Sequence, residues 1–253
     1  MNASPPAPIP TPRDPNQPAG SALQEALPEA SLEAGPPASP RPVHPSVATM
    51  ELSNGPRLSG RQASPATTKL RLATVWLAGC SGCHLSLLDL DEWLFVLAEQ
   101  AEIVYSPLVS DVKIYPESVD VCLVEGAVAS SDQLAMARIL RERTRLVVAF
   151  GDCAISSHLP GLRNRLAAEP GGGATAVLER AYDDLADLHP QRPWAPGQLP
   201  ELLERVLPLH EVIPVDLWLP GCPPPPERIR QVLEALIHGD DPRLEGPEGL
   251  RFG

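Results

Sequence analysis

Apolar runs without polar alternation, separated by helical segments, constrain the fold of this chain more than any other feature. The runs expected to form strands are 69–77 (K-L-R-L-A-T-V-W-L), 102–109, 120–124 (D-V-C-L-V), 145–150 (R-L-V-V-A-F) and 211–219. A strand that is apolar on both faces must be buried on both faces, as in a parallel sheet covered by helices. The sequence therefore predicts an α/β domain with a doubly wound, flavodoxin-like parallel sheet.

Helical signals occur between these runs. Segment 84–100 carries leucines at helical spacing, and segment 130–144 opens on S-S-D, which suits a helix N-cap. Segment 227–239 places apolar residues on one face and ends at a glycine, a common helix stop signal. Segment 157–200 contains P-G-G-G-A and H-P-Q-R-P-W-A-P-G around one short helical piece, so we expect an irregular surface insertion there.

The amino-terminal part of the chain has a different composition from the rest. Residues 1–66 hold 15 of the 32 prolines and contain no Phe, Tyr or Trp. Such a segment cannot bury enough apolar surface to offset the entropy lost on ordering it. We therefore expect 1–66 to be a disordered Pro/Ala/Ser-rich tail, 67–238 to form a single domain, and 239–253 to be a short carboxyl-terminal tail.

Charge and hydropathy exclude several classes of function. The net charge is −12, which makes the chain a poor candidate for binding nucleic acid. No run of 18 apolar residues is present, and the first residues lack the basic and apolar regions of a secretory signal. We therefore expect a cytoplasmic protein without a membrane span. Thiols stay reduced in the cytoplasm, so the five cysteines are interpreted as metal ligands or catalytic groups rather than disulfides.

Four of the cysteines follow predicted strands. Cys80 and Cys83 come after the first run, in A-G-C-S-G-C-H, while Cys153 (G-D-C-A) and Cys222 (P-G-C-P) each come directly after a later run. Because the carboxyl ends of parallel strands share one edge of a sheet, we expect these four thiols to converge there. Cys122 lies inside the run D-V-C-L-V and is expected to be a small buried hydrophobe outside this site.

Four convergent thiolates suit either a cubane iron–sulfur cluster or a zinc ion. A structural zinc site usually pairs two short C-x-x-C units, and only one is present here, so the spacing favours the cluster. A thioredoxin-like redox pair would need no further cysteines and is less favoured. A flavodoxin-like sheet could bind FMN at the same edge, but the chain lacks a Thr/Ser-rich phosphate loop, so FMN is also less favoured.

The chain resembles the small subunit of [NiFe]-hydrogenases in four motifs that occur in the same order. These motifs are L-A-G-C-S-G-C-H-L-S-L-L-D, V-E-G-A-V, F-G-D-C-A and L-P-G-C-P-P. The resemblance covers roughly 67–238 and extends to the related 20 kDa subunit of complex I, which has adjacent cysteines in place of C-S-G-C. Within the hydrogenases, the chain resembles the cytoplasmic, bidirectional NAD-reducing type. Two segments carry this resemblance, L-A-T-V-W-L-A-G-C-S-G-C-H and V-L-E-R-A-Y.

The resemblance implies an electron-transfer subunit that is not catalytic alone and holds one proximal [4Fe-4S] cluster. It implies Cys80, Cys83, Cys153 and Cys222 as ligands, a large subunit with the Ni–Fe site, and iron–sulfur and flavin diaphorase subunits that reduce NAD. Alternatives are a complex I-like quinone oxidoreductase, a hydrogenase using another carrier, and a non-enzymatic zinc scaffold. The exposed edge implies a largely apolar interface with the large subunit.

Three further polar residues near the predicted edge are given structural interpretations. Glu125 is expected to be a solvated or N-capping carboxylate rather than a group that relays protons or tunes the cluster, although V-E-G is one of the motifs that carry the resemblance. Asp152, in G-D-C, suits a turn. His84 follows the second cysteine and is expected to pack or cap rather than bind iron.

Overall fold

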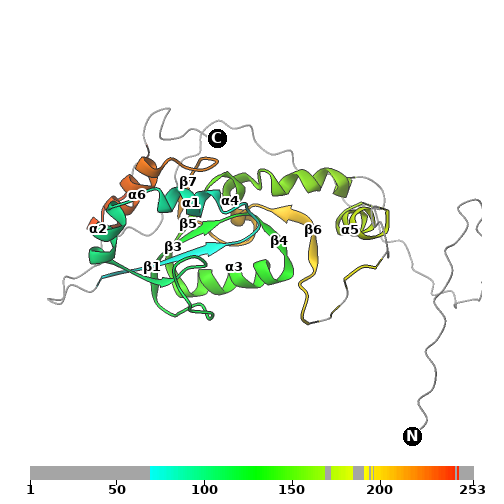
Figure 1. The fold of residues 1–253 in the computed structure, drawn as a ribbon, viewed down its shortest axis with the longest axis horizontal. Coiled ribbons are helices and arrows are strands. Elements are labelled where there is room, and N and C mark those ends of the chain that lie inside the picture. The colour runs from blue at the N-terminus through cyan, green and yellow to red at the C-terminus, as the bar shows by residue number, and fades with distance from the viewer. Residues whose placement is uncertain are drawn as a thin grey trace, which may run out of the picture. The chain divides into compact units, whose positions relative to one another are not determined.

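A five-stranded parallel sheet forms the centre of the structure, a computed structural model that describes residues 69–168, 172–184, 191–193, 195, 197–242 and 244. Its strand order is β2-β1-β3-β5-β7, and every pair of neighbouring strands runs parallel (Figure 1). This is the order of a flavodoxin-like sheet, so the predicted fold class is confirmed. The strands are β1 (Leu70–Trp76), β2 (Ala101–Tyr105), β3 (Val119–Glu125), β5 (Thr144–Phe150) and β7 (Leu217–Leu219).

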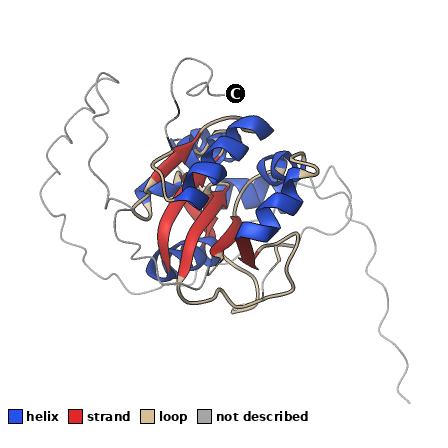
Figure 2. Cartoon of the chain, turned by 90° about the vertical axis from the view of Figure 1, so that its left-hand side faces the viewer, coloured by secondary structure: helices blue, strands red, loops and turns tan. Residues whose placement is uncertain are grey.

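Helices cover both faces of this sheet (Figure 2). On one face, α1, α2 and α6 pack against side chains such as Leu72, Leu123 and Phe150. On the other face, α3 and α4 pack against Ala73 and Val124, among others. The alternation of neighbouring strand residues between two apolar cores explains why the strands show no polar alternation in sequence. The helices are α1 (Gly82–Leu88), α2 (Trp93–Gln100), α3 (Ser131–Arg143), α4 (Asp152–Ser156), α5 (Ala174–Glu179) and α6 (Pro226–His238).

A second, two-stranded sheet lies beside the main one and was not predicted. In it β4 (Val128–Ser130) pairs antiparallel with β6 (Leu202–Leu207). Half of the positions of β6 are exposed and one is buried, and its sequence L-L-E-R-V-L is not the continuous apolar run of a buried strand. The remaining described elements are not α-helices: η1 (Pro160–Ala168) and η3 (Leu209–Glu211) are 3₁₀-helices, and η2 (Arg180–Asp184) is a π-helix.

Three predicted elements are shorter than expected, and one of them is the strand predicted over 102–109, which ends at Tyr105 as β2. The helix predicted over 84–100 is two helices, α1 and α2, because the chain turns between them and Asp91 adopts a left-handed conformation with a φ of 47°. The strand predicted over 211–219 is limited to β7, since η3 occupies its beginning and Pro214 lies between them. A proline cannot donate a ladder hydrogen bond, which disfavours a strand through that position.

The segment 157–200 is more regular than the predicted insertion. It contains η1, α5 and η2 within its described residues. The predicted tail at 1–66 lies outside the described residues, as does most of the tail at 239–253. Within the described part of the chain, no helix has the length and apolar character needed to cross a membrane.

Candidate metal centre

Four of the five cysteines lie at the carboxyl edge of the central sheet. Cys80 is exposed in the loop after β1, and Cys83 is buried in the first turn of α1. Cys153 is buried in α4, directly after β5, and Cys222 is exposed in the loop after β7. These strands are parallel members of one sheet, so their carboxyl ends lie at the same edge. The structure thus brings together the four cysteines that the sequence singled out.

Cys83 lies close enough to the other three thiols for their charge to affect its protonation. Burial raises the pKa of the Cys83 thiol well above its usual range, and negative charge on Glu125 and on the other three thiols raises it further. Burial likewise raises the pKa of Cys153 to about 11, with a smaller contribution from Cys222. Thiols that oppose one another's ionisation would be stabilised as thiolates by a positively charged centre among them.

The four thiols are not arranged as the ligands of a single metal ion would be. Within the described residues, no group of three or more His, Cys, Asp or Glu side chains is arranged to hold a metal ion. Thiolate ligands of one zinc ion all lie about 2.3 Å from a common point. A cubane iron–sulfur cluster makes no such demand, since each thiolate binds a different iron.

Glycines make room for the sulfurs beside the backbone. A Cβ on Gly82 would lie 3.3 Å from the Sγ of Cys80, and a Cβ on Gly151 would lie 2.2 Å from the Sγ of Cys83. Gly151 also has a φ of +84°, which side-chain-bearing residues rarely adopt. The donor set and these glycines therefore fit a sulfur-ligated metal group at this edge.

Hydrogen bonds tie the cysteine-bearing loops to one another. Asp152 is buried; its Oδ1 accepts the N–H of Gly221 at 2.7 Å, and its own N–H donates to the Gly221 carbonyl at 3.0 Å. Ser86 of α1 donates its hydroxyl to the Pro224 carbonyl at 2.6 Å. Asp152 is therefore more than the turn residue that the sequence predicts, because it connects the loops of the third and fourth cysteines.

Glu125 is buried, which corrects the expectation of a solvated carboxylate. It ends β3, where it lies in register between Trp76 of β1 and Phe150 of β5, and only 1% of its surface is exposed. Its Oε2 accepts the backbone N–H of His84 in the first turn of α1 at 3.0 Å and also contacts the Nδ1 of His84. The expectation of an N-capping carboxylate is close to what the structure shows, because the carboxylate accepts a hydrogen bond from an N–H in the first turn of a helix.

His84 itself packs in the interior, as expected. It is 1% exposed, and its ring meets that of Phe150 edge-on with the centroids 6.1 Å apart.

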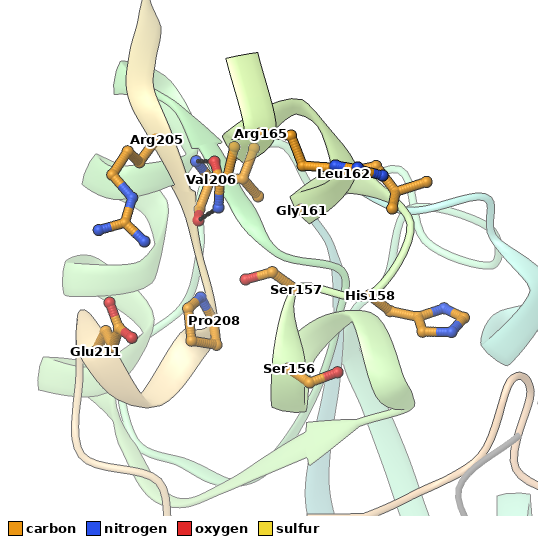
Figure 3. Close-up of a pocket in the computed structure, with 11 residues that line it drawn as sticks. Ser156, Ser157, His158, Gly161, Leu162, Arg165, Arg205, Val206, Pro208 and Glu211 are labelled. Atoms are coloured by element: carbon orange, nitrogen blue, oxygen red, sulfur yellow. Dashed lines mark hydrogen bonds between the residues drawn. The ribbon is translucent and has the colours of Figure 1, made fainter. Parts of the chain in front are cut away.

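A cavity of about 300 Å³ is lined in part by His158, a residue that contacts Cys222. His158 lies on one side of this cavity and Arg205 and Glu211 on the other (Figure 3). The Nδ1 of His158 is 3.8 Å from the Sγ of Cys222. His158 was not among the residues predicted from the sequence, and its signal would have been the C-x-x-x-x-H spacing from Cys153.

Cys122 lies in the core, as the sequence predicts. It occupies the middle of β3 and is fully buried, and burial raises the pKa of its thiol to about 12. The groups that act on this thiol are Tyr115 and Arg141 rather than the four cysteines at the sheet edge.

The sequence matches known proteins over most of the described residues. A family model described as NADH ubiquinone oxidoreductase, 20 kDa subunit, matches residues 80–236. Subunit delta of the NAD-reducing hydrogenase HoxS from Cupriavidus necator is 34% identical over 175 residues, covering 68% of this chain and 80% of that protein. One vhu-type subunit of the F420-non-reducing hydrogenase from Methanocaldococcus jannaschii is 36% identical over 179 residues, covering 70% of this chain and 59% of that protein. The chain spans about three fifths of the length of such archaeal relatives.

A solved structure also resembles the chain. One chain of a crystal structure of NAD⁺-reducing [NiFe]-hydrogenase in the H2-reduced state is similar with a TM-score of 0.67 and 39% sequence identity. The similarity covers 74% of this chain and 100% of that chain.

Gly151→Ala should destabilise the fold more than Gly239→Ala. Both glycines have a positive φ, but a Cβ on Gly239 would meet no atom within 4 Å. We expect Gly239→Ala to lower the free energy of unfolding by about 1 kcal/mol. Overlap with Cys83 should make Gly151→Ala lower it by roughly 1–3 kcal/mol more. Urea unfolding of the full-length chain followed by circular dichroism measures both, and equal losses would contradict the close approach of Cys83.

Proposed function

The chain belongs to the NADH ubiquinone oxidoreductase 20 kDa subunit family, and from this premise we propose that it is the electron-transfer small subunit of a [NiFe]-hydrogenase. The observation that carries the proposal is the convergence of Cys80, Cys83, Cys153 and Cys222 at one edge of the sheet. In this proposal the four thiolates hold one [4Fe-4S] cluster. When bound, such a cluster would supply one-electron redox chemistry. No residue of this chain is assigned a catalytic role.

The uneven burial of the four cysteines supports a group that is shared with a partner surface. Cys83 and Cys153 are buried, whereas Cys80 and Cys222 are exposed. A group held by all four would therefore be embedded on one side and open on the other. Covering the open side would exclude water from the sulfurs, and the burial and hydrogen bonding of the sulfurs are what tune a redox potential.

Exposed apolar side chains occur in the segments next to the two exposed cysteines. Trp76 and Leu85 flank the C-S-G-C loop, and Leu159 follows His158, which is next to Cys222. Each is more than two fifths exposed, with values of 43%, 55% and 56%. Fully burying one large apolar side chain contributes about 1.5–3 kcal/mol. We assign this edge to contact with a [NiFe]-hydrogenase large subunit, which would supply the Ni–Fe site.

NAD is the acceptor that we propose for the whole assembly. The chain spans 80% of the Cupriavidus necator NAD-reducing hydrogenase subunit and 100% of the chain from the NAD⁺-reducing hydrogenase structure. In the proposal this cytoplasmic chain lies between the large subunit and the iron–sulfur and flavin diaphorase subunits that reduce NAD. The second candidate is a hydrogenase with another carrier, which is supported by the 36% identity to subunits of F420-non-reducing hydrogenases.

Two other functions have less support from the residues. A quinone-reducing role would follow the description of the family model, but the separated C-S-G-C cysteines favour the hydrogenase side of the resemblance. A zinc scaffold would need sulfurs placed around one point, and the described residues contain no such group.

Replacing Cys153 by serine should remove the iron, whereas replacing Cys122 should not. Cys153 belongs to the four-thiol group, and Cys122 is a buried core residue in the middle of β3. We expect about four irons per wild-type chain purified anaerobically, as for one cubane cluster. The Cys122→Ser variant should keep that iron, and the Cys153→Ser variant should lose it together with hydrogen-dependent electron transfer.

Elemental analysis with an acid-labile sulfide assay measures this outcome. If both variants kept or both lost their iron, the ligand assignment would be wrong. About one zinc per wild-type chain, without iron, would instead establish the scaffold function.

The purified assembly containing this chain should reduce NAD⁺ when it is given dihydrogen. The measurement is NADH absorbance under hydrogen, with a one-electron dye as the control acceptor. Dye reduction without NADH formation would indicate a hydrogenase that uses another carrier. Quinone reduction without hydrogen uptake would indicate the complex I-like function.

A further inference from the structure

The buried carboxylate of Glu125, which contacts the end of the C-S-G-C loop, has no role in the proposed electron transfer. Glu125 ends β3, which has a parallel neighbour on each side, and the rest of that strand is Val, Asp, Val, Cys, Leu and Val. Burying a carboxylate costs several kcal/mol unless it is paired or hydrogen-bonded, and an apolar side chain of similar volume would avoid this cost. A reason for its presence must therefore lie in what it contacts.

The contacts of Glu125 are with the loop that carries the first two cysteines. Its Oε2 accepts the N–H of His84 at 3.0 Å and contacts the His84 ring at Nδ1. Its backbone carbonyl accepts the N–H of Leu77 at 2.8 Å, where the same loop begins. A Cβ on Gly79 would lie 3.3 Å from Oε1, so the loop passes close to the carboxylate. One residue therefore holds both the beginning and the end of the segment 77–84.

His84 has polar contacts on one side of its ring only. Nδ1 faces Glu125, whereas Nε2 is buried and has no hydrogen-bond partner among the described residues. The ring also lines a largely apolar pocket with Leu72, Leu87 and Leu97, among others. Among the described residues, the carboxylate of Glu125 is thus the polar group that orients this ring.

The segment held in this way includes Cys83, the buried cysteine directly before His84. The backbone N–H that donates to Glu125 belongs to the residue next to Cys83, so their positions are linked through one peptide bond. The Cys83 sulfur in turn occupies the space that Gly151 leaves free. A shift of His84 would move the sulfur relative to the loop of Cys153.

We propose that Glu125 and His84 are positioning residues that hold the Cys83 sulfur in place for the metal group, an inference that rests on the proposed function. The link between Glu125 and Cys83 is the hydrogen bond that Glu125 accepts from the N–H of the neighbouring residue, His84. Its contribution is geometric, and it should depend on a hydrogen-bond acceptor at position 125 rather than on a charge.

The test compares Glu125→Ala and Glu125→Gln in the full-length chain, isolated anaerobically with its copurifying subunits. Removing a group that orients a metal ligand typically lowers metal affinity by roughly 10–100-fold. Glu125→Ala should therefore lose iron to a chelator under conditions where the wild type retains it. Glu125→Gln keeps an acceptor and should retain its iron. Because it removes negative charge beside the sulfurs, it should also show a higher midpoint potential by EPR-monitored titration.

Tyr115→Phe is the matched control. It removes a buried hydrogen bond of 2.6 Å between Tyr115 and Thr144, which is the first residue of β5 and thus lies at the opposite edge of the sheet. This variant should lose some stability but keep its iron and its EPR spectrum. If Tyr115→Phe lost iron as readily as Glu125→Ala, the effect would be one of general stability and the positioning role would be overturned.

Failure of this inference can be distinguished from failure of the proposed function. A wild-type chain without an iron–sulfur cluster would overturn both. A wild-type cluster that is lost in Cys153→Ser but unchanged in Glu125→Ala would overturn the positioning role alone. Should Glu125→Ala not fold, Glu125→Asp decides, because it keeps the charge but is one methylene shorter, which withdraws the carboxylate from the N–H and the ring of His84. Iron loss in that variant supports the inference, and wild-type iron and EPR overturn it.

Discussion

The parallel arrangement of β1, β3, β5 and β7 is the constraint on which the rest of this structure depends. Parallel strands end at a common edge, so loops distant in sequence become neighbours without a disulfide or a repeated motif to join them. The strands are held by two apolar cores, one on each face of the sheet. Because the cores stabilise the scaffold, the loops at the edge are free to carry side chains that contribute chemistry rather than packing.

The edge is organised by polar contacts that the cores could not supply. Asp152 joins the loops of the last two cysteines, and Glu125 joins the C-S-G-C loop to the end of β3. Both carboxylates are at most 2% exposed, so each carries a desolvation cost that its hydrogen bonds must offset. At Gly151 the absence of a side chain lets the Cys83 sulfur approach the backbone. The positions of the loops at this edge thus depend both on these hydrogen bonds and on the space that Gly151 leaves for the sulfur.

The sequence was sufficient to predict the sheet type and the meeting of four cysteines, because both follow from apolar runs and from what directly follows them. It was not sufficient where distant residues decide the local structure. Glu125 and His84 are 41 residues apart, and Cys222 and His158 are 64 apart, so neither contact has a local signature. The leucine spacing in 84–100 predicts one helix, but the chain turns at Asp91 and forms two helices, α1 and α2. The half-exposed strand β6 lacks the continuous apolar run by which the buried strands are recognised.

The central claim is that sulfurs from three loops bind one cluster of several irons, and X-ray absorption at the iron and zinc edges tests it most directly. The anaerobically purified chain should show an iron edge with sulfur neighbours and a second shell of iron–iron scattering, as expected for a cubane. A zinc edge with four sulfur neighbours at about 2.3 Å, and no iron–iron scattering, would contradict the account.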